Sequence, residues 1–454
     1  MALFGNPLLV FLIGVIAVVL LLVWLDLPAF VGLILATFVV GLVTPEVPIA
    51  EIPATTAENF GTVMTSIGIP ILMAAIIGKS LMESGAAERI VRWFLAITGR
   101  DNSDVALLGS SYVLSIPVFF DNVFYLLAPL ARSMRARTGG HMAAYVSALS
   151  AGALATHMLV PPTPGPLAMA DEIGVDVGTV IMVGIVVAIP TSLVGGFVYA
   201  RWIDKRMDIT LKEAMGTTAE ELEAVAEKPV ESLPGLGESM LPILVAVGFV
   251  ATSTIADVLG ASGAVTTATT FIGDPNFALT AAALVAAYTF YRAADLSRDT
   301  FGDELTEALK SGGNIVAITA AGGAFGAMLG AAGVGEYFAS NLQQAGISLL
   351  ITSWLIAGLI RIAQGSGTVA LLTTSALMAP LAGDLAVHPV YMIMAIGTGG
   401  MMFSWYNDSG FWIASEVAGI TQTETLKTWS AVNSVMSVTG LVVVLVLSQL
   451  VPTL

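Results

Sequence analysis

Long apolar runs separated by short polar segments make up most of this chain. A helix rises about 1.5 Å per residue, so crossing a hydrocarbon layer about 30 Å thick takes roughly 20 apolar residues. Runs of this kind predict spans at 7–25, 28–44, 60–83, 141–170, 177–202, 239–258, 276–292, 312–332, 388–415 and 428–450. The pattern therefore predicts an all-α polytopic membrane protein with about ten transmembrane helices.

Two further apolar stretches, 104–134 and 347–383, do not fit one span each, because each contains a central break. Each divides into two short helices of about 14 residues, or roughly 20 Å, which is too short to cross the bilayer. We expect both to be re-entrant hairpins that enter and leave the membrane on the same side. The spans 141–170 and 388–415 are also interrupted by polar segments, which predicts two broken helices.

The distribution of charge predicts the sidedness, because Lys and Arg collect in short cytoplasmic loops. Arginines flank the stretch 104–134, while the loops 45–59 and 171–176 contain acids and no base. These patterns place the first hairpin's ends inside and the two acidic loops outside. Residues 204–238 form an acidic, Glu-rich segment, predicted as a cytoplasmic linker. The first apolar run lacks a basic leader, so we expect a retained span, and both termini are predicted to be extracytoplasmic.

An internal repeat is visible in the sequence. Three matches recur in order at nearly the same offset: Gly78, Leu81, Gly85 and Glu88 with Gly326, Leu329, Gly333 and Glu336; Ala128-Pro129-Leu130-Ala131 with Ala379-Pro380-Leu381-Ala382; and Gly165 and Gly174 with Gly410 and Gly419. We expect residues 1–203 and 239–454 to form two repeats, each with an odd number of crossings, so that the second is inverted. Inverted repeats whose discontinuous helices meet at mid-membrane are typical of secondary transporters.

Composition narrows the possible functions. The chain is 56% hydrophobic and 11% charged, against about 25% charged residues in soluble domains. A formal charge of -16 argues against a nucleic-acid partner, which would require a basic surface. With no cysteine and three histidines, we expect no metal site and no cofactor. The sequence contains no phosphate-binding GxxxxGK[ST] motif, so transport would be driven by an ion gradient.

Polar residues gather at the four predicted breaks. They should face the protein interior, because unpaired backbone groups and charges are costly in lipid. The short helices that begin there would direct partially positive N-terminal amides inward, which favours an anion. Hydroxyl and amide side chains beside them suit a polyhydroxy acid. The candidate substrate-binding residues are Ser115, Asn122, Thr163, Gly165, Arg361, Gln364, Gly365, Ser366, Gly367, Thr368, Asn407 and Ser409.

The candidate proton-coupling residues are Asp121, His157 and Asp408. Histidine titrates near neutral pH, although a neutral core histidine fits the pattern equally well. Each aspartate also stands where it can cap the helix that follows it. Arg361 lies too deep to reach the membrane surface, so we expect it to neutralise Asp121 or Asp408, or to bind the substrate carboxylate with two parallel hydrogen bonds.

At these residues the chain resembles the GntP family of gluconate permeases, within the larger ion-transporter superfamily. The resemblance covers essentially the whole chain and is most specific at SIPVFFDNVFYLLAPLARS (115–133), ATHMLVPPTPGPLAMADEIGVDVG (155–178), QGSGTVALLTTSALMAPL (364–381) and SWYNDSGFW (404–412). It implies proton symport of gluconate or a similar sugar acid in a plasma-membrane homodimer with scaffold and transport domains and an elevator movement. Family members also take idonate, fructuronate or D-serine.

Other functions fit parts of the pattern. A sodium-coupled carboxylate transporter of the same superfamily would hold its cation with hairpin-tip carbonyls and hydroxyls, whereas the acidic and histidine side chains favour proton coupling. An intramembrane hydrolase using Ser366 or Ser409 with His157 is disfavoured, because no GxSxG motif surrounds either serine. A channel fits inverted re-entrant halves less well than alternating access does. We therefore predict a transporter and not an enzyme.

Overall fold

The structure is a computed structural model of the chain. It describes residues 6–25, 27–99, 102–138, 141–210, 232–294, 297–334, 337, 348–405 and 408–453. Within the helices, the side chains at 19, 22, 23, 29, 121, 125, 136–138, 257, 258, 298, 363, 364 and 409 lie outside this description. Secondary structure in the described residues is helical, as a chain that must satisfy its backbone groups inside lipid requires.

The first half of the chain forms a series of helices that follows the predicted order. They are α1 (Pro7–Val19), a π turn η1 (Leu20–Trp24), α2 (Ala29–Val43), α3 (Ile52–Glu83), α4 (Ala86–Thr98), α5 (Ser103–Leu114), α6 (Phe120–Thr138), α7 (Met142–Leu159), α8 (Pro164–Ile173), α9 (Val177–Leu193), η3 (Val194–Tyr199) and α10 (Ala200–Asp204).

The second half repeats much of this order. It comprises α12 (Leu236–Val258), α13 (Ala264–Gly273), α14 (Pro275–Ala293), α15 (Arg298–Ala331), α17 (Leu349–Gln364), α18 (Gly367–Met378), η5 (Ala379–Asp384), α19 (Val390–Gly399), α20 (Ser409–Ala418), α21 (Gln422–Thr425), the π turn η6 (Leu426–Ser430) and α22 (Ala431–Leu450). Segment 204–238, predicted as the linker, is described only at its two ends, so residues 211–231 lie outside the described part.

Both stretches with a central break fold as pairs of short helices. In the first pair, α5 ends at Leu114 and α6 begins at Phe120, with the turn over 115–119. In the second pair, α17 ends at Gln364 and α18 begins at Gly367. Gly365 separates them with φ 90°, a left-handed conformation that glycine adopts without steric cost.

Both predicted broken helices are also present. The helix α7 ends at Leu159 and α8 resumes at Pro164, so the prolines fall in the break or in the first turn, where a missing N–H costs nothing. The helix α19 ends at Gly399 and α20 resumes at Ser409, which leaves a longer non-helical segment between them. The all-α fold with its interrupted helices is therefore as the sequence predicts.

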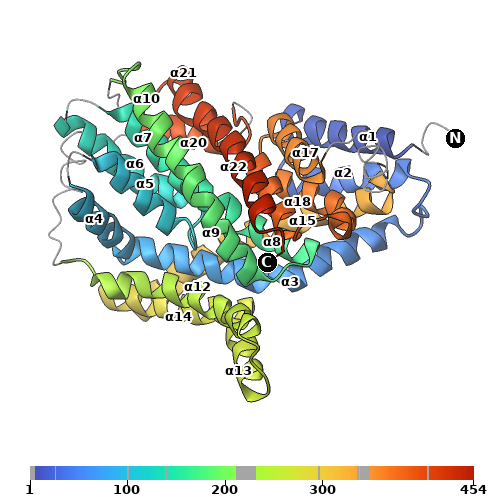
Figure 1. Cartoon of the computed structure of the whole chain (residues 1–454), viewed down its shortest axis with the longest axis horizontal. Coiled ribbons are helices and arrows are strands. Elements are labelled where there is room, and N and C mark those ends of the chain that lie inside the picture. Colours follow the sequence, from blue (N-terminus) through green and yellow to red (C-terminus); the bar gives the residue numbers. More distant parts are fainter. Residues whose placement is uncertain are drawn as a thin grey trace.

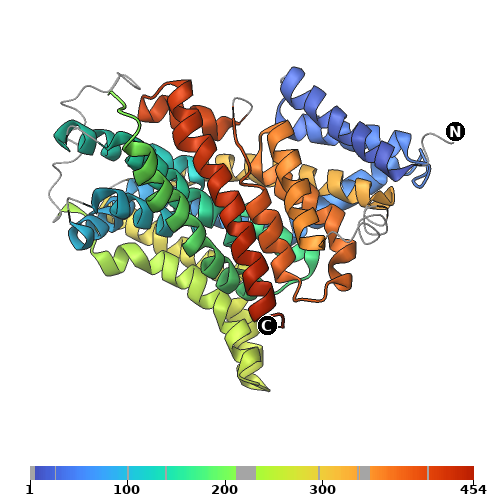
Figure 2. The same cartoon turned by 45° about the horizontal axis from the view of Figure 1, so that its top comes forward.

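The two hairpins lie on opposite sides of the molecule. Figure 1 shows α5 and α6 at the left and α17 and α18 at the right, with α9 and α22 crossing between them, and Figure 2 shows the same separation from a second direction. The second half of each broken helix packs against the other half's hairpin: α8 contacts α18, and α20 contacts α6. The two halves of the chain are thus interlocked at the breaks.

The longest helices, α3 and α15, pack along each other and form a layer beside the hairpins. Glycines on α15 allow close packing: a Cβ on Gly322 would press on Leu372, and one on Gly326 would collide with Ala376, both on α18. The layer therefore approaches the second hairpin closely at these two glycines.

Among the described helices of ten residues or more, two were not predicted. The helix α4 is amphipathic and packs on α5 and α12, and α13 extends away from the body in both views. Neither contains a long apolar run, which is why the pattern of spans misses them. Six described helical stretches are long and apolar enough to cross a membrane, or seven if α13 and α14, bent by 60° at their junction, count as one. The number of spans, the inversion of the repeats and the repeat boundaries stay predictions.

Candidate functional site

A cavity of about 150 Å³ lies where the breaks of the two halves meet. Its walls come from the start of α6, the end of α7, the tip between α17 and α18, the start of α20 and the π turn η6. An engineered cavity of comparable size, about 150 Å³, holds a molecule as large as benzene. The lining residues are Phe120, Leu154, His157, Met158, Arg361, Ser366, Gly367, Thr368, Asp408, Gly410 and Trp429.

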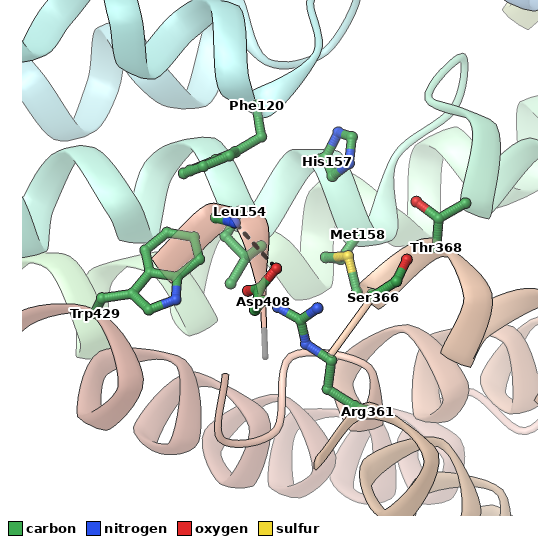
Figure 3. Close-up of a pocket in the computed structure, with 11 residues that line it drawn as sticks. Phe120, Leu154, His157, Met158, Arg361, Ser366, Thr368, Asp408 and Trp429 are labelled. Carbon is green, nitrogen blue, oxygen red and sulfur yellow. Dashed lines mark hydrogen bonds and ion pairs between the residues drawn. The ribbon is translucent and has the colours of Figure 1, made fainter. Parts of the chain in front are cut away.

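Arg361 and Asp408 form an ion pair in the wall of this cavity (Figure 3). The Nη2 atom of Arg361 donates to Oδ2 of Asp408 at 2.6 Å, and Nη1 donates to the carbonyl of Gly365. The two side chains are 4% and 7% exposed, so solvent screens their charges weakly. The sequence offered Asp121 or Asp408 as the ion-pair partner of Arg361, and the structure shows the pair with Asp408. This contact joins α17 to the start of α20.

Helix starts surround the ion pair. Asp408 caps α20 by accepting from the backbone N–H of Gly410 at 3.0 Å, and Ser366 caps α18 by accepting from Val369 at 3.3 Å. Phe120 is the first residue of α6 and also lines the cavity. The N-termini of α6, α18 and α20 thus border one space, and their partial positive charges favour an anion there.

His157 enters the cavity from α7, in the first half of the chain. Its Nδ1 atom is buried and has no hydrogen-bond partner among the described residues. Figure 3 shows the imidazole on the far side of Met158 from the Arg361 guanidinium. Arg361, Asp408 and His157 are therefore the ionisable groups among the described lining residues.

Several predicted site residues are described but do not line the cavity. Thr163 is buried and donates to the carbonyls of His157 and Val160, both at 2.8 Å, so its hydroxyl closes the end of α7. Gly165 packs on Leu371, where a Cβ would come within 2.7 Å of a methyl group. The remaining two are Ser115, whose buried hydroxyl has no partner among the described residues, and Asn122 on α6.

The sequence placed further candidates on residues that the structure does not describe. They are Asn407, and the side chains of Asp121, Gln364 and Ser409. Their roles stay predictions.

Sequence reasoning missed the aromatic wall of the cavity. Trp429 is 1% exposed and lies 4.9 Å from Phe120 between ring centroids, and its ring also packs over Gly410. Trp429 lies at the start of the last predicted span, in the sequence LKTWS, where no helix break and no buried charge marks it as a site residue. Only the folded backbone indicates a role for Trp429, because the residue lies in a π turn, and such turns occur often at functional sites.

Known proteins resemble this chain over its full length. The profile of the GntP family permeases matches residues 6–451. The chain is 33% identical to a gluconate permease of Pseudomonas aeruginosa, over 96% of each protein. It is also 33% identical to a high-affinity gluconate transporter of Escherichia coli, over 98% of this chain and 100% of that protein. An L-idonate transporter of Escherichia coli is 29% identical over 97% of this chain and 99% of that protein.

Two solved structures share the fold at low sequence identity. The YdaH transporter of Alcanivorax borkumensis superposes with a TM-score of 0.62 at 12% identity, covering 96% of this chain and 98% of that one. MtrF of Neisseria gonorrhoeae, described as an antimetabolite efflux pump, gives 0.62 at 15% identity over 88% and 83%. Together with the interrupted helices and the interior ion pair, these matches show that the chain is a multi-pass membrane permease that belongs to the GntP family.

Proposed function

We propose that this protein imports gluconate, or a closely related small hydroxylated acid, together with a proton. The observation that carries the proposal is the buried Arg361–Asp408 pair in a cavity formed by the breaks of both halves. Relatives named as gluconate permeases support the substrate class. The hydroxyls of Ser366 and Thr368 at the cavity can hydrogen-bond the hydroxyl groups of a sugar acid.

Charge balance supports proton coupling. The charges of Arg361 and Asp408 cancel, so a substrate carboxylate would bring an uncompensated negative charge into a buried site. Protonation of His157 would restore neutrality, because its imidazole is the remaining ionisable group among the described lining residues. Anion and proton would thus each favour the binding of the other.

We further propose that the hairpins and broken helices move together against the layer of α3 and α15, as in an elevator. The elements that line the cavity belong to the hairpins, the broken helices and η6, whereas α3 and α15 contribute no described lining residue. We also propose that the protein is a homodimer in the plasma membrane, with both termini extracytoplasmic.

Uptake into proteoliposomes tests the proposal. Purified protein is reconstituted, and labelled gluconate accumulation is followed with an inward proton gradient, then with an inward sodium gradient at equal pH on both sides. We expect accumulation in the first case and only equilibration in the second. Accumulation driven by sodium alone would refute proton coupling and support a sodium-coupled carboxylate transporter. If labelled L-idonate or D-serine is accumulated in place of gluconate, the substrate assignment is wrong.

A further inference from the structure

A chain of hydrogen bonds runs behind the ion pair. Nε1 of Trp429 donates to Oγ of Ser404 at 2.6 Å, and Oγ of Ser404 donates to Oδ2 of Asp408. The same Oδ2 accepts from Arg361, and Oδ1 accepts from the backbone of Gly410. Trp429 and Ser404 are 1% and 0% exposed, so water does not compete for these bonds.

The direction of each bond in this chain is fixed by chemistry. The indole N–H and the guanidinium can only donate, and so can the backbone N–H of Gly410. The hydroxyl of Ser404 accepts from the indole and donates its own hydrogen to the ionised Asp408. The two oxygens of Asp408 thus accept three hydrogen bonds, from Arg361, Ser404 and the backbone of Gly410.

This arrangement holds the Asp408 carboxylate in place, because its two oxygens accept from donors on different segments of the chain. Among the described ionisable residues at the cavity, Nε of Arg361 and Nδ1 of His157 are buried without a hydrogen-bond partner.

We propose that Trp429 and Ser404 are positioning residues for substrate binding. They fix the Asp408 carboxylate, and Asp408 in turn holds the guanidinium of Arg361 at the angle at which it meets the substrate carboxylate. Trp429 reaches the site from η6, where the π turn precedes α22, so the last helix of the chain takes part in orienting a residue of the second hairpin. The inference rests on the anion site proposed above.

Substrate affinity in single and double variants tests this. Trp429→Phe keeps an aromatic ring against Phe120 but removes the indole donor, and Ser404→Ala removes the link to Asp408. The bond from Ser404 reaches a charged group, and its loss corresponds to roughly a tenfold change in affinity or more, whereas the bond from Trp429 joins two neutral groups and contributes less. We expect the KM for gluconate uptake to rise about tenfold in Ser404→Ala and by a smaller factor in Trp429→Phe, with Vmax nearly unchanged in both.

The double variant distinguishes a chain from two separate effects. Since both side chains act through the same bond to Asp408, the double variant should have nearly the KM of Ser404→Ala, instead of the product of the two changes. If Ser404→Ala does not fold, Trp429→Phe alone still reports on the chain, because it replaces one buried ring by another. Multiplicative effects, or an unchanged KM in Trp429→Phe, would overturn the inference.

Trp354→Phe is a matched control. Nε1 of Trp354 also donates to a serine hydroxyl, that of Ser437 at 3.0 Å, but Trp354 does not line the cavity. It should lower thermal stability without changing KM, and an equal rise in KM would assign the effect to general destabilisation. Gluconate binding to the wild type, measured by calorimetry, separates the two proposals. No binding refutes the anion site itself, whereas normal binding with unaffected variants refutes only the role of Trp429 and Ser404.

Discussion

Neutralising one member of the Arg361–Asp408 pair gives the sharpest test of the site. Asp408→Asn keeps the shape of the side chain but leaves the guanidinium, in a side chain 4% exposed, without its counter-charge. Breaking a buried pair in this way destabilises proteins by about 3–5 kcal/mol, because a desolvated charge is left uncompensated. Arg361→Met should cost a similar amount, since Asp408 then keeps only Ser404 and Gly410 as donors.

Replacing both residues should be less harmful than replacing either. With Arg361→Met and Asp408→Asn combined, the site contains no unpaired charge from this pair, and such replacements are often neutral or stabilising. The double variant should therefore unfold at a higher temperature than either single variant. Thermal unfolding of the four purified proteins in one detergent provides the comparison.

Added gluconate should distinguish the four proteins. In Asp408→Asn, the guanidinium is no longer held at the angle at which it meets the substrate carboxylate, so gluconate should stabilise this variant less than the wild type. Tenfold weaker binding removes about 1.4 kcal/mol of stabilisation at the same ligand concentration. Arg361→Met should gain nothing. Equal stabilisation of all four proteins by gluconate would refute the reasoning, because the anion would then bind elsewhere.

Three further predictions concern other parts of the structure. His157→Gln should abolish accumulation against a gradient while exchange of labelled for unlabelled gluconate continues, because exchange needs no net proton movement; lost exchange in a folded variant would contradict this. Gly326→Leu should sharply reduce thermal stability and transport, since its side chain collides with Ala376, whereas Gly313→Leu on the same helix, with no atom within 4 Å of a Cβ, should have little effect. Arg201→Ala should cost about 2–3 kcal/mol in an unfolding titration, because it leaves a buried aspartate of α5 without the arginine that pairs with it at 2.6 Å.

The sequence predicts the interrupted helices well because their causes are local. Pro161 and Pro162 cannot continue α7, and Gly365 adopts the left-handed turn that ends α17. By contrast, α4 and α13 escape prediction because neither is long and apolar, and a search for membrane spans does not register such helices.

The partners at the site could not be predicted, because they depend on how distant segments pack. Arg361 had candidate partners in both halves, and only the folded chain shows that it meets Asp408. Trp429 lies at the start of the last predicted span, where nothing in the sequence marks its role, since a tryptophan there could equally be ordinary core. The residues with charge or helix-breaking character were found, and those acting through tertiary contacts were not.

Because Asp408 neutralises Arg361, the pair adds no net charge to the part of the protein that would move across the membrane potential. Moving one elementary charge through the membrane potential is worth about 2.3 kcal/mol per 100 mV. Counting the described ionisable groups at the cavity, the empty site with a neutral His157 bears no net charge, and neither does the site loaded with one anion and one proton. On the proposed mechanism both states would cross without electrical work, so the pH difference alone would set the final ratio of gluconate inside to outside, and clamping the voltage would leave that ratio unchanged.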